Sequence, residues 1–263
     1  MNKTFLYIDI LGFEKLVRDK SPKVDKIFSI IDGLNVHRHF AIKTIVFSDT
    51  ILVFNKSEEH SNHYYVTYLI EYVQKLFYKL SYLNIYFKGL ITLGEFNFSE
   101  LKNIDAYYGL ALIDTYKDES NLDGFGLYID KKLSNDVVVF DKIEFNEKYD
   151  FVLLCQSLIL LYEFTNGKLP IDTEILFETD RFHRIDEDLR FLREIEYLKN
   201  NHPKERIKGK YQKVYELYKS VTLNFFKKFE EEGFLPFTLN SDYPGSINPF
   251  DILAEIELNQ EIK

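Results

Sequence analysis

The sequence predicts an α+β domain built on a mixed β-sheet, followed by a mostly helical C-terminal extension. Two observations indicate the sheet: a continuous apolar run, Phe5 to Ile8, and two β-rich segments, 43–47 and 50–54, only two residues apart. A third is the helical spacing of apolar residues from Val66 to Leu83, directly before another apolar strand at 85–93. With 46% apolar residues, the chain can form a core of this size.

The other elements of the predicted domain follow in order. We expect helices at Phe13–Val17, Val24–Ile31 and Gly109–Glu119, and short strands at Gly126–Ile129 and Val137–Phe140. This order contains the βαββαβ arrangement of ferredoxin-like folds, in which a hairpin adds antiparallel pairs to the sheet.

The character of the sequence changes after about Tyr149. Apolar residues then recur at helical spacing in two stripes, Leu189–Leu192–Ile195–Leu198 and Val214–Leu217–Val221–Phe225–Phe229. A polar tail containing Pro244 and Pro249 follows. We therefore expect two domains: a sheet domain at residues 1–148 and a helical extension at residues 149–263.

Charge and cysteine content restrict the partners and the compartment. The formal net charge of −9 disfavours binding to nucleic acid or to an anionic membrane. Cys155 is the single cysteine, which excludes an intrachain disulfide and suits a reducing compartment. The longest apolar stretch, residues 151–162, is shorter than the roughly 20 residues of a membrane-spanning helix. These features predict a cytoplasmic protein.

Two aspartates stand where the chemistry of a site would be expected. Asp9 ends the first apolar strand, and Asp49 lies between the two strands of the hairpin. In a ferredoxin-like sheet these positions are close enough for both carboxylates to share divalent cations. Mg²⁺ and Mn²⁺ prefer hard oxygen ligands, typically one or two carboxylates together with phosphate oxygens. Gly12 would let a phosphate approach the backbone. The pattern therefore favours a nucleoside triphosphate site with two metal ions.

Four motifs, in order, resemble class III nucleotide cyclases over roughly residues 3 to 140. "YIDILGF" resembles their D-I-x-G-F motif, and "FSDTILVF" their hairpin with the second metal aspartate. "FKGLITLGEF" is similar to a later strand, and "YYGLALIDTYKDES" to a glycine-led helix. The hairpin and the helix look most like the Pycsar uridylate and cytidylate cyclases of bacterial antiphage defence.

The resemblance implies an enzyme that converts UTP or CTP to a 3′,5′-cyclic mononucleotide and pyrophosphate, using two Mg²⁺ or Mn²⁺ ions. It also implies a homodimer whose active sites are each built from both protomers. In such an enzyme the metals would be held by Asp9, Asp49 and the Ile10 carbonyl. Lys117 would offer positive charge to the transition state. The residues expected to bind substrate are Leu11, Gly12, Phe13, Lys88 and Tyr108.

Three positions depart from the purine cyclases of this class. Ile45 stands where those enzymes have a base-reading lysine, and the nearest lysine is Lys43. Ile113 and Lys117 stand in place of an asparagine and an arginine, and lysine lacks the bidentate fork of arginine. The first departure favours a pyrimidine base, whose pocket would be narrowed by aromatic residues at positions 47, 87, 107 and 108.

Two other functions fit the same residues. The lost asparagine and arginine are also compatible with a catalytically degenerate module that keeps the cyclase fold and only binds nucleotides or regulates. A polymerase-type nucleotidyltransferase on a similar sheet is the other alternative. Product analysis after incubation with each of the four nucleoside triphosphates would separate the three.

Overall fold

The computed structural model describes residues 2–34, 36, 39–172, 174 and 184–243. The chain divides into two compact units, Met1–Leu154 and Cys155–Lys263. The polar tail expected around Pro244 and Pro249 lies outside the described residues. No helix in the described part of the chain is long and apolar enough to cross a bilayer.

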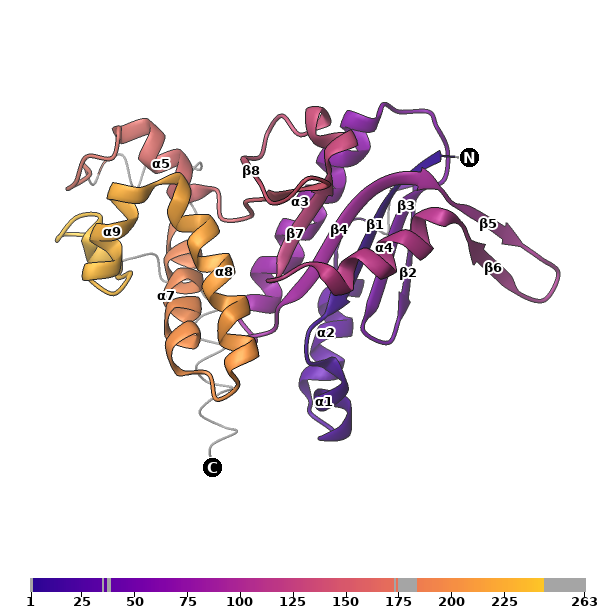
Figure 1. The fold of residues 1–263 in the computed structure, drawn as a ribbon, viewed down its shortest axis with the longest axis horizontal. Coiled ribbons are helices and arrows are strands. Elements are labelled where there is room, and N and C mark those ends of the chain that lie inside the picture. The colour runs from indigo at the N-terminus through magenta and orange to yellow at the C-terminus, as the bar shows by residue number, and fades with distance from the viewer. Residues whose placement is uncertain (1, 35, 37–38, 173, 175–183, 244–263) are drawn as a thin grey trace. The chain divides into compact units, whose positions relative to one another are not determined.

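The first unit is built on a mixed seven-stranded sheet (Figure 1). Its strands are β1 (Asn2–Ile10), β2 (Ile42–Phe47), β3 (Thr50–Asn55), β4 (Phe87–Glu95), β7 (Gly126–Asp130), β8 (Lys142–Glu144) and β9 (Tyr149–Val152). They are arranged in the order β2-β3-β1-β4-β7-β9-β8, and the pairing of β4 with β7 is parallel. The predicted α+β class, mixed sheet and βαββαβ order are thereby confirmed, with β1 central between β3 and β4.

Helices cover both faces of this sheet. The helices of this unit are α1 (Phe13–Arg18), α2 (Lys23–Asp32), α3 (Asn62–Ser81) and α4 (Leu110–Asn121), of which α3 and α4 pack on β1 and β4. Figure 1 shows α4 in front of β4 and β1, with α3 behind the same strands. On the α4 face, Phe5 and Tyr7 of β1 form a buried cluster with Phe54, Phe96 and Ala111. The alternate residues of β1 are also buried, which is why the strand reads as a continuous apolar run.

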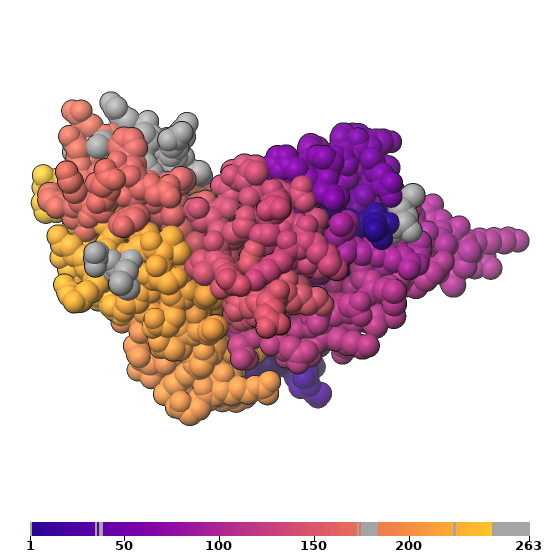
Figure 2. Space-filling model, turned by 45° about the horizontal axis from the view of Figure 1, so that its top comes forward, coloured from indigo at the N-terminus to yellow at the C-terminus, as the bar shows by residue number. Residues whose placement is uncertain are grey.

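A separate two-stranded hairpin projects from this sheet. Strands β5 (Asn97–Glu100) and β6 (Asp105–Tyr108) pair antiparallel between β4 and α4. Figures 1 and 2 both show the hairpin extending away from the body of the unit. Its tip residues Leu101 and Ile104 are more than half exposed. The hairpin is therefore an arm with apolar side chains in solvent.

The strand predicted at Val137–Phe140 is wrong. Asp130 caps a 3₁₀ helix, Lys131–Asp136, by accepting the Lys132 N–H, and the strand β8 forms only afterwards at 142–144. Val138 and Val139 are more than 60% exposed. Their β-branched side chains favour a strand, but no strand in the described part of the chain pairs with them.

The end of the sheet domain also differs from expectation. Residues 149–152, which we expected to begin the helical extension, form β9, and β9 pairs with both β7 and β8. The first compact unit accordingly runs to Leu154. Apolar residues on a doubly covered strand show no alternation, so a short run of this kind resembles a buried helix in sequence.

The second unit is helical, as expected. It contains α5 (Ser157–Thr165), α7 (Ile185–Asn201), α8 (Glu205–Val221) and α9 (Leu223–Glu231). The second apolar stripe does not form one helix, because the chain breaks at Thr222 between α8 and α9. The fully buried Asp188 of α7 accepts the Leu158 N–H at the start of α5. Burial raises the pKa of the Cys155 thiol well above its usual value, which suits a structural cysteine.

Candidate active site

Asp9 and Asp49 lie at the same end of the sheet on neighbouring strands. A two-residue turn, Ser48–Asp49, joins β2 to β3, and Ser48 adopts a left-handed conformation with φ of 56°. The backbone N–H of Ile10 donates to the Asp49 carbonyl at 2.9 Å, which ties the end of β1 to this turn. Both aspartates are half-buried. The fold therefore places the two aspartates that the sequence singled out at the same end of the sheet.

The turn after β1 offers two backbone amides to the same region. Gly12 has φ of +76°, a left-handed conformation that favours glycine, and open space surrounds the position of a Cβ. Among the described residues, no backbone carbonyl accepts from the amides of Gly12 or Phe13. The Phe13 side chain is buried and packs edge-on against Phe28, which fixes the turn.

Leu11 departs from the expected phosphate-binding role. Its N–H donates to the Tyr86 carbonyl at 2.9 Å, so this amide already has a partner in the sheet. The extended backbone at the end of β1 continues its hydrogen bonding toward the β4 side of the sheet, and Leu11 is the last residue that does so. The amides left from the predicted group are those of Gly12 and Phe13.

A buried hydroxyl lies beneath Asp9. Tyr7 is 4% exposed and is on the same face of β1 as Asp9. Burial raises the pKa of the Tyr7 phenol to about 12; the nearby Asp9 and Glu119 also raise it, whereas a hydrogen bond with Thr50 lowers it. Tyr7 therefore stays protonated at neutral pH and does not serve as a base. No motif marked Tyr7 in the sequence, because one tyrosine in an apolar strand reads as core.

Helix α4 is fixed to β4 at three successive levels. A Cβ added to Gly94 would lie 3.1 Å from the Ala111 Cβ. The hydroxyls of Thr92 and Thr115 are 3.3 Å apart. Four residues along a helix advance about 6 Å, and two residues along a strand about 6.6 Å, so the step from Ala111 to Thr115 on α4 matches the step from Gly94 to Thr92 on β4. The next contact on β4 lies four residues further along, where a long lysine side chain reaches back to the helix.

The third level is a buried ion pair. The Lys88 Nζ lies 2.7 Å from the Glu119 Oε1 and also donates to the Glu119 carbonyl at 2.7 Å. The two side chains are only 5% and 16% exposed. Because Lys88 is the cross-strand partner of Asp9, this pair lies next to the carboxylates. The lysine expected to bind substrate is thus engaged by α4 in this structure.

The helix begins at a glycine for a steric reason. Gly109 has φ of +155°, and a Cβ at this position would lie 2.3 Å from the Glu95 carbonyl oxygen. No other residue can follow β6 and enter α4 so close to the end of β4. Gly109 thereby fixes where α4 begins and hence where its three contacts with β4 start.

The outer face of α4 points away from its own sheet. Leu110, Ile113 and Tyr116 are between 49% and 66% exposed, and Lys117 is exposed as well. Lys117 is two residues from both Thr115 and Glu119, so at about 100° per residue it lies opposite the face that contacts β4. The structure does not bring Lys117 to Asp9 of the same chain.

The aromatic residues and the lysine expected near the base pocket do not gather at one place in the structure. Phe87 is 1% exposed, and its cross-strand partner is Ile10, so it belongs to the core and not to a base pocket. Phe47 and Tyr108 are exposed. The Lys43 ammonium contacts Glu100 of the β5–β6 arm at 3.2 Å. Lys43 is therefore occupied away from the position where purine cyclases carry their base-reading lysine.

The donor set suits a hard divalent cation that is completed by substrate. In the described residues, no group of three or more His, Cys, Asp or Glu side chains could hold a metal ion. Asp9 and Asp49 supply two carboxylates, which matches Mg²⁺ sites that take one or two carboxylates plus phosphate oxygens. The Ile10 carbonyl remains a predicted third ligand.

Solved structures with a similar fold are nucleotide cyclase domains. The guanylyl cyclase Cya2 is 17% identical over 58% of this chain and 91% of its own, with a TM-score of 0.43. The adenylyl cyclase CyaB from P. aeruginosa is 12% identical over 58% of this chain and 93% of its own, with a TM-score of 0.45. A bacterial light-regulated adenylyl cyclase is 14% identical over 63% of this chain and 96% of its own, with a TM-score of 0.43. No protein-family model and no curated protein matches the sequence.

Proposed function

We propose that this chain is a metal-dependent nucleotide cyclase that acts on a pyrimidine nucleoside triphosphate, UTP or CTP. The observation that supports the proposal is that Asp9 and the Asp49 turn lie at the same end of the sheet, where the Ile10 N–H donates to the Asp49 carbonyl. The open amides of Gly12 and Phe13 lie in the turn directly after them. Carboxylates beside free amides suit a metal-bound triphosphate.

In the proposed reaction the ribose 3′-oxygen forms a bond to the α-phosphorus, and the bond to the pyrophosphate oxygen breaks. The hydroxyl proton passes to solvent. Two Mg²⁺ or Mn²⁺ ions, when bound, would favour the 3′-alkoxide and neutralise the triphosphate. Asp9 and Asp49 would hold them, with Ile10 contributing its carbonyl. Thr50 and Tyr7 would keep Asp9 in place from beneath.

The outward face of α4 supports a homodimer with shared sites. Lys117 lies on the side of α4 that faces away from the sheet of its own chain, so it would serve the Asp9 and Asp49 of a partner chain. The exposed Leu110, Ile113 and Tyr116 on the same face provide apolar surface for that contact. Tyr108, also exposed, lies at the start of this surface and would approach substrate there.

Two residues support the preference for a pyrimidine. Ile45 packs against the buried cluster of Phe5 and Tyr7, so no charged group stands at the purine-reading position. Lys43, two residues away, is bound to the β5–β6 arm. We further propose, on the sequence resemblance alone, that the cyclic nucleotide acts as a second messenger in antiphage defence.

The test is incubation of the purified protein with each of the four nucleoside triphosphates and Mn²⁺, followed by chromatography of the products. The proposal expects cyclic UMP or cyclic CMP, with turnover well above that of ATP and GTP. A site that hydrogen-bonds one base rejects others strongly, because the wrong base leaves buried polar groups unpaired. Efficient formation of cyclic AMP without a pyrimidine product would overturn the base assignment.

A second candidate function is a nucleotide-binding regulatory module without catalysis. It is favoured by Ile113 and Lys117 at the places of the usual asparagine and arginine, and by the engagement of Lys88 with Glu119. Under this alternative the same incubation yields no cyclic product from any nucleotide, while the triphosphate still binds in the presence of the metal.

A further inference from the structure

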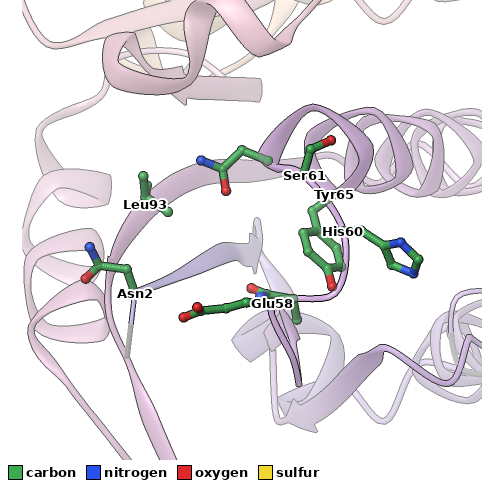
Figure 3. Close-up of a pocket in the computed structure, with 8 residues that line it drawn as sticks. Asn2, Glu58, His60, Ser61, Tyr65 and Leu93 are labelled. Atoms are coloured by element: carbon green, nitrogen blue, oxygen red, sulfur yellow. The ribbon is translucent and has the colours of Figure 1, made fainter.

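A polar cavity lies at the end of the sheet opposite Asp9. It has a volume of about 550 Å³, and it is bounded by the start of β1, the loop after β3 and the start of α3 (Figure 3). Asn2 lines it, and Asn2 is seven residues from Asp9 along β1, about 23 Å at the rise of a strand. The cavity is therefore separate from the candidate active site, and its volume is that of a small-molecule pocket.

Buried polar side chains hold the loop that forms one wall, residues 56–61. Asn55 accepts the Thr4 N–H at 2.8 Å and donates to the Ser57 carbonyl at 2.7 Å. The Tyr65 hydroxyl donates to the same carbonyl at 2.9 Å. The Lys3 ammonium donates to the Lys56 carbonyl at 2.9 Å.

These supporting side chains are almost fully enclosed: Lys3 and Asn55 are 3% exposed and Tyr65 is 1% exposed. Burying an ammonium or an amide is unfavourable unless the group is hydrogen-bonded. Here the Lys3 ammonium donates to a loop carbonyl, and the Asn55 amide bonds both to the loop and to β1. The wall is therefore preformed, as in a binding site held by a rigid scaffold.

The groups that face the cavity select the kind of ligand. Glu58 is the charged residue among those that line it, and Figure 3 shows its carboxylate extending from the loop toward Asn2. The Asn62 Oδ1 accepts a hydrogen bond from the Thr4 hydroxyl, so the Asn62 Nδ2 can donate to a ligand. The described lining includes no lysine or arginine, and a phosphate would meet the Glu58 carboxylate. Burial lowers the pKa of the nearby Lys3 ammonium and Glu58 raises it, and this ammonium donates to the Lys56 carbonyl. A ligand with N–H donors fits better.

Several other side chains around the cavity are aromatic or apolar. The rings of His60 and Tyr64 are 4.4 Å apart at their centroids and inclined by 39°. Tyr64 is 38% exposed, and the His60 ring in Figure 3 points to the outer side of the cavity. Leu93 and the Tyr65 ring give apolar walls. A flat heterocycle can therefore contact these apolar walls as well as form hydrogen bonds.

We propose that this cavity binds an uncharged nucleoside whose base carries two adjacent N–H donors, with guanosine as the best match. The Glu58 carboxylate accepts both donors of the guanine N1–H and N2–H₂ edge, in the bidentate geometry that carboxylates favour. Asn2 and Asn62 meet the carbonyl and sugar oxygens, and Leu93 contacts the base. The inference does not depend on the proposed cyclase activity.

The test is isothermal titration calorimetry of the full chain with guanosine, inosine and adenosine. Guanosine should bind saturably, and inosine, which lacks the N2 amine, should bind about tenfold more weakly. Glu58→Gln should weaken guanosine binding by a similar factor, because the amide replaces one acceptor oxygen with a donor. Glu59→Gln is the matched control, since its neighbouring carboxylate does not line the cavity; it should bind as the wild type does.

The Asp9→Asn, Asp49→Asn double variant separates this site from the candidate active site. It should bind guanosine with unchanged affinity, whether or not the wild-type protein makes a cyclic nucleotide. Three results would overturn the proposal: no saturable guanosine binding, equal affinity in Glu58→Gln, or loss of binding in the double variant.

Discussion

At the Asp9 end of β1, half-buried carboxylates lie beside open amides, whereas at the Asn2 end buried polar side chains hold the loop after β3. The carboxylates of Asp9 and Asp49 are half-buried beside the open amides of the Gly12 turn. At the other end, Lys3 and Asn55 are buried and bonded to the loop after β3. A protein keeps polar groups open where a ligand will satisfy them and encloses them where they hold its own backbone. Substitutions at the first end should therefore change activity, and those at the second end stability.

The largest effect is expected for Asp9→Asn and Asp49→Asn. Each removes an anionic oxygen ligand, so cyclase activity should fall by about 100-fold or more. The urea midpoint should change little, because both side chains are half-buried at the surface. Asp25→Asn, an exposed carboxylate on α2, is the control and should keep full activity. Wild-type rates in both aspartate variants would show that the metal assignment is wrong.

The next effect is a rescue between two inactive chains. An Asp9→Asn chain mixed with a Lys117→Ala chain should form a heterodimer with one intact site, and activity should return to at most half of the wild-type value. Mixing Asp9→Asn with Asp49→Asn should restore nothing, because each composite site then lacks a metal ligand. The measurement is product formation by the purified, differently tagged heterodimer. An inactive heterodimer of the first kind would contradict shared sites or the role of Lys117.

The Lys88–Glu119 pair should affect stability strongly although it lies at the active-site end. Glu119→Gln leaves a buried ammonium without its anionic partner, and the free energy of unfolding should fall by about 3 kcal/mol. Replacing both residues, as Lys88→Met with Glu119→Leu, should recover most of that loss, because a well-packed apolar pair needs no desolvation of charge. Urea unfolding of the three proteins measures this.

Activity of the refolded double variant then decides what Lys88 does. If Lys88 binds substrate, as its motif predicts, the double variant should be stable but weakly active, with an increased KM. Full activity would mean that Lys88 only fixes α4 to β4. Either result sharpens the comparison between the two ends of β1, since it shows whether the buried Lys88 binds substrate or only stabilises the fold.

The smallest effect is expected at the Asn2 end. Asn55→Ala removes two hydrogen bonds and leaves the buried Thr4 N–H without an acceptor, which should lower the free energy of unfolding by about 2 kcal/mol. Asn97→Ala, whose amide makes an exposed hydrogen bond, should cost much less. The kcat/KM of both variants should match the wild type. A loss of kcat/KM in Asn55→Ala without a loss of stability would contradict the view that the Asn2 end of β1 supports the fold and the Asp9 end supports activity.

Much of the fold could be predicted because its signals are local. The continuous apolar run of β1, the two-residue spacing of the β2–β3 hairpin and the helical spacing of α3 each specify an element within a short window. The failures are local too: Val138 and Val139 favour a strand, but they remain exposed, and none of the strands that the structure describes pairs with them. Strand propensity describes a side chain that fits a half-buried sheet, and it cannot supply the partner strand.

The sequence by itself determined which residues end β1 and turn the hairpin, so Asp9, Asp49 and Gly12 were visible as a candidate site before the structure. Only the tertiary structure decided which of the other polar residues are engaged. Lys88 meets Glu119 thirty-one residues away, and Asn55 meets Thr4 fifty-one residues away. Such partners depend on strand register and on the three-level contact between α4 and β4. Register is set by packing across the whole sheet, and no short window of sequence contains it.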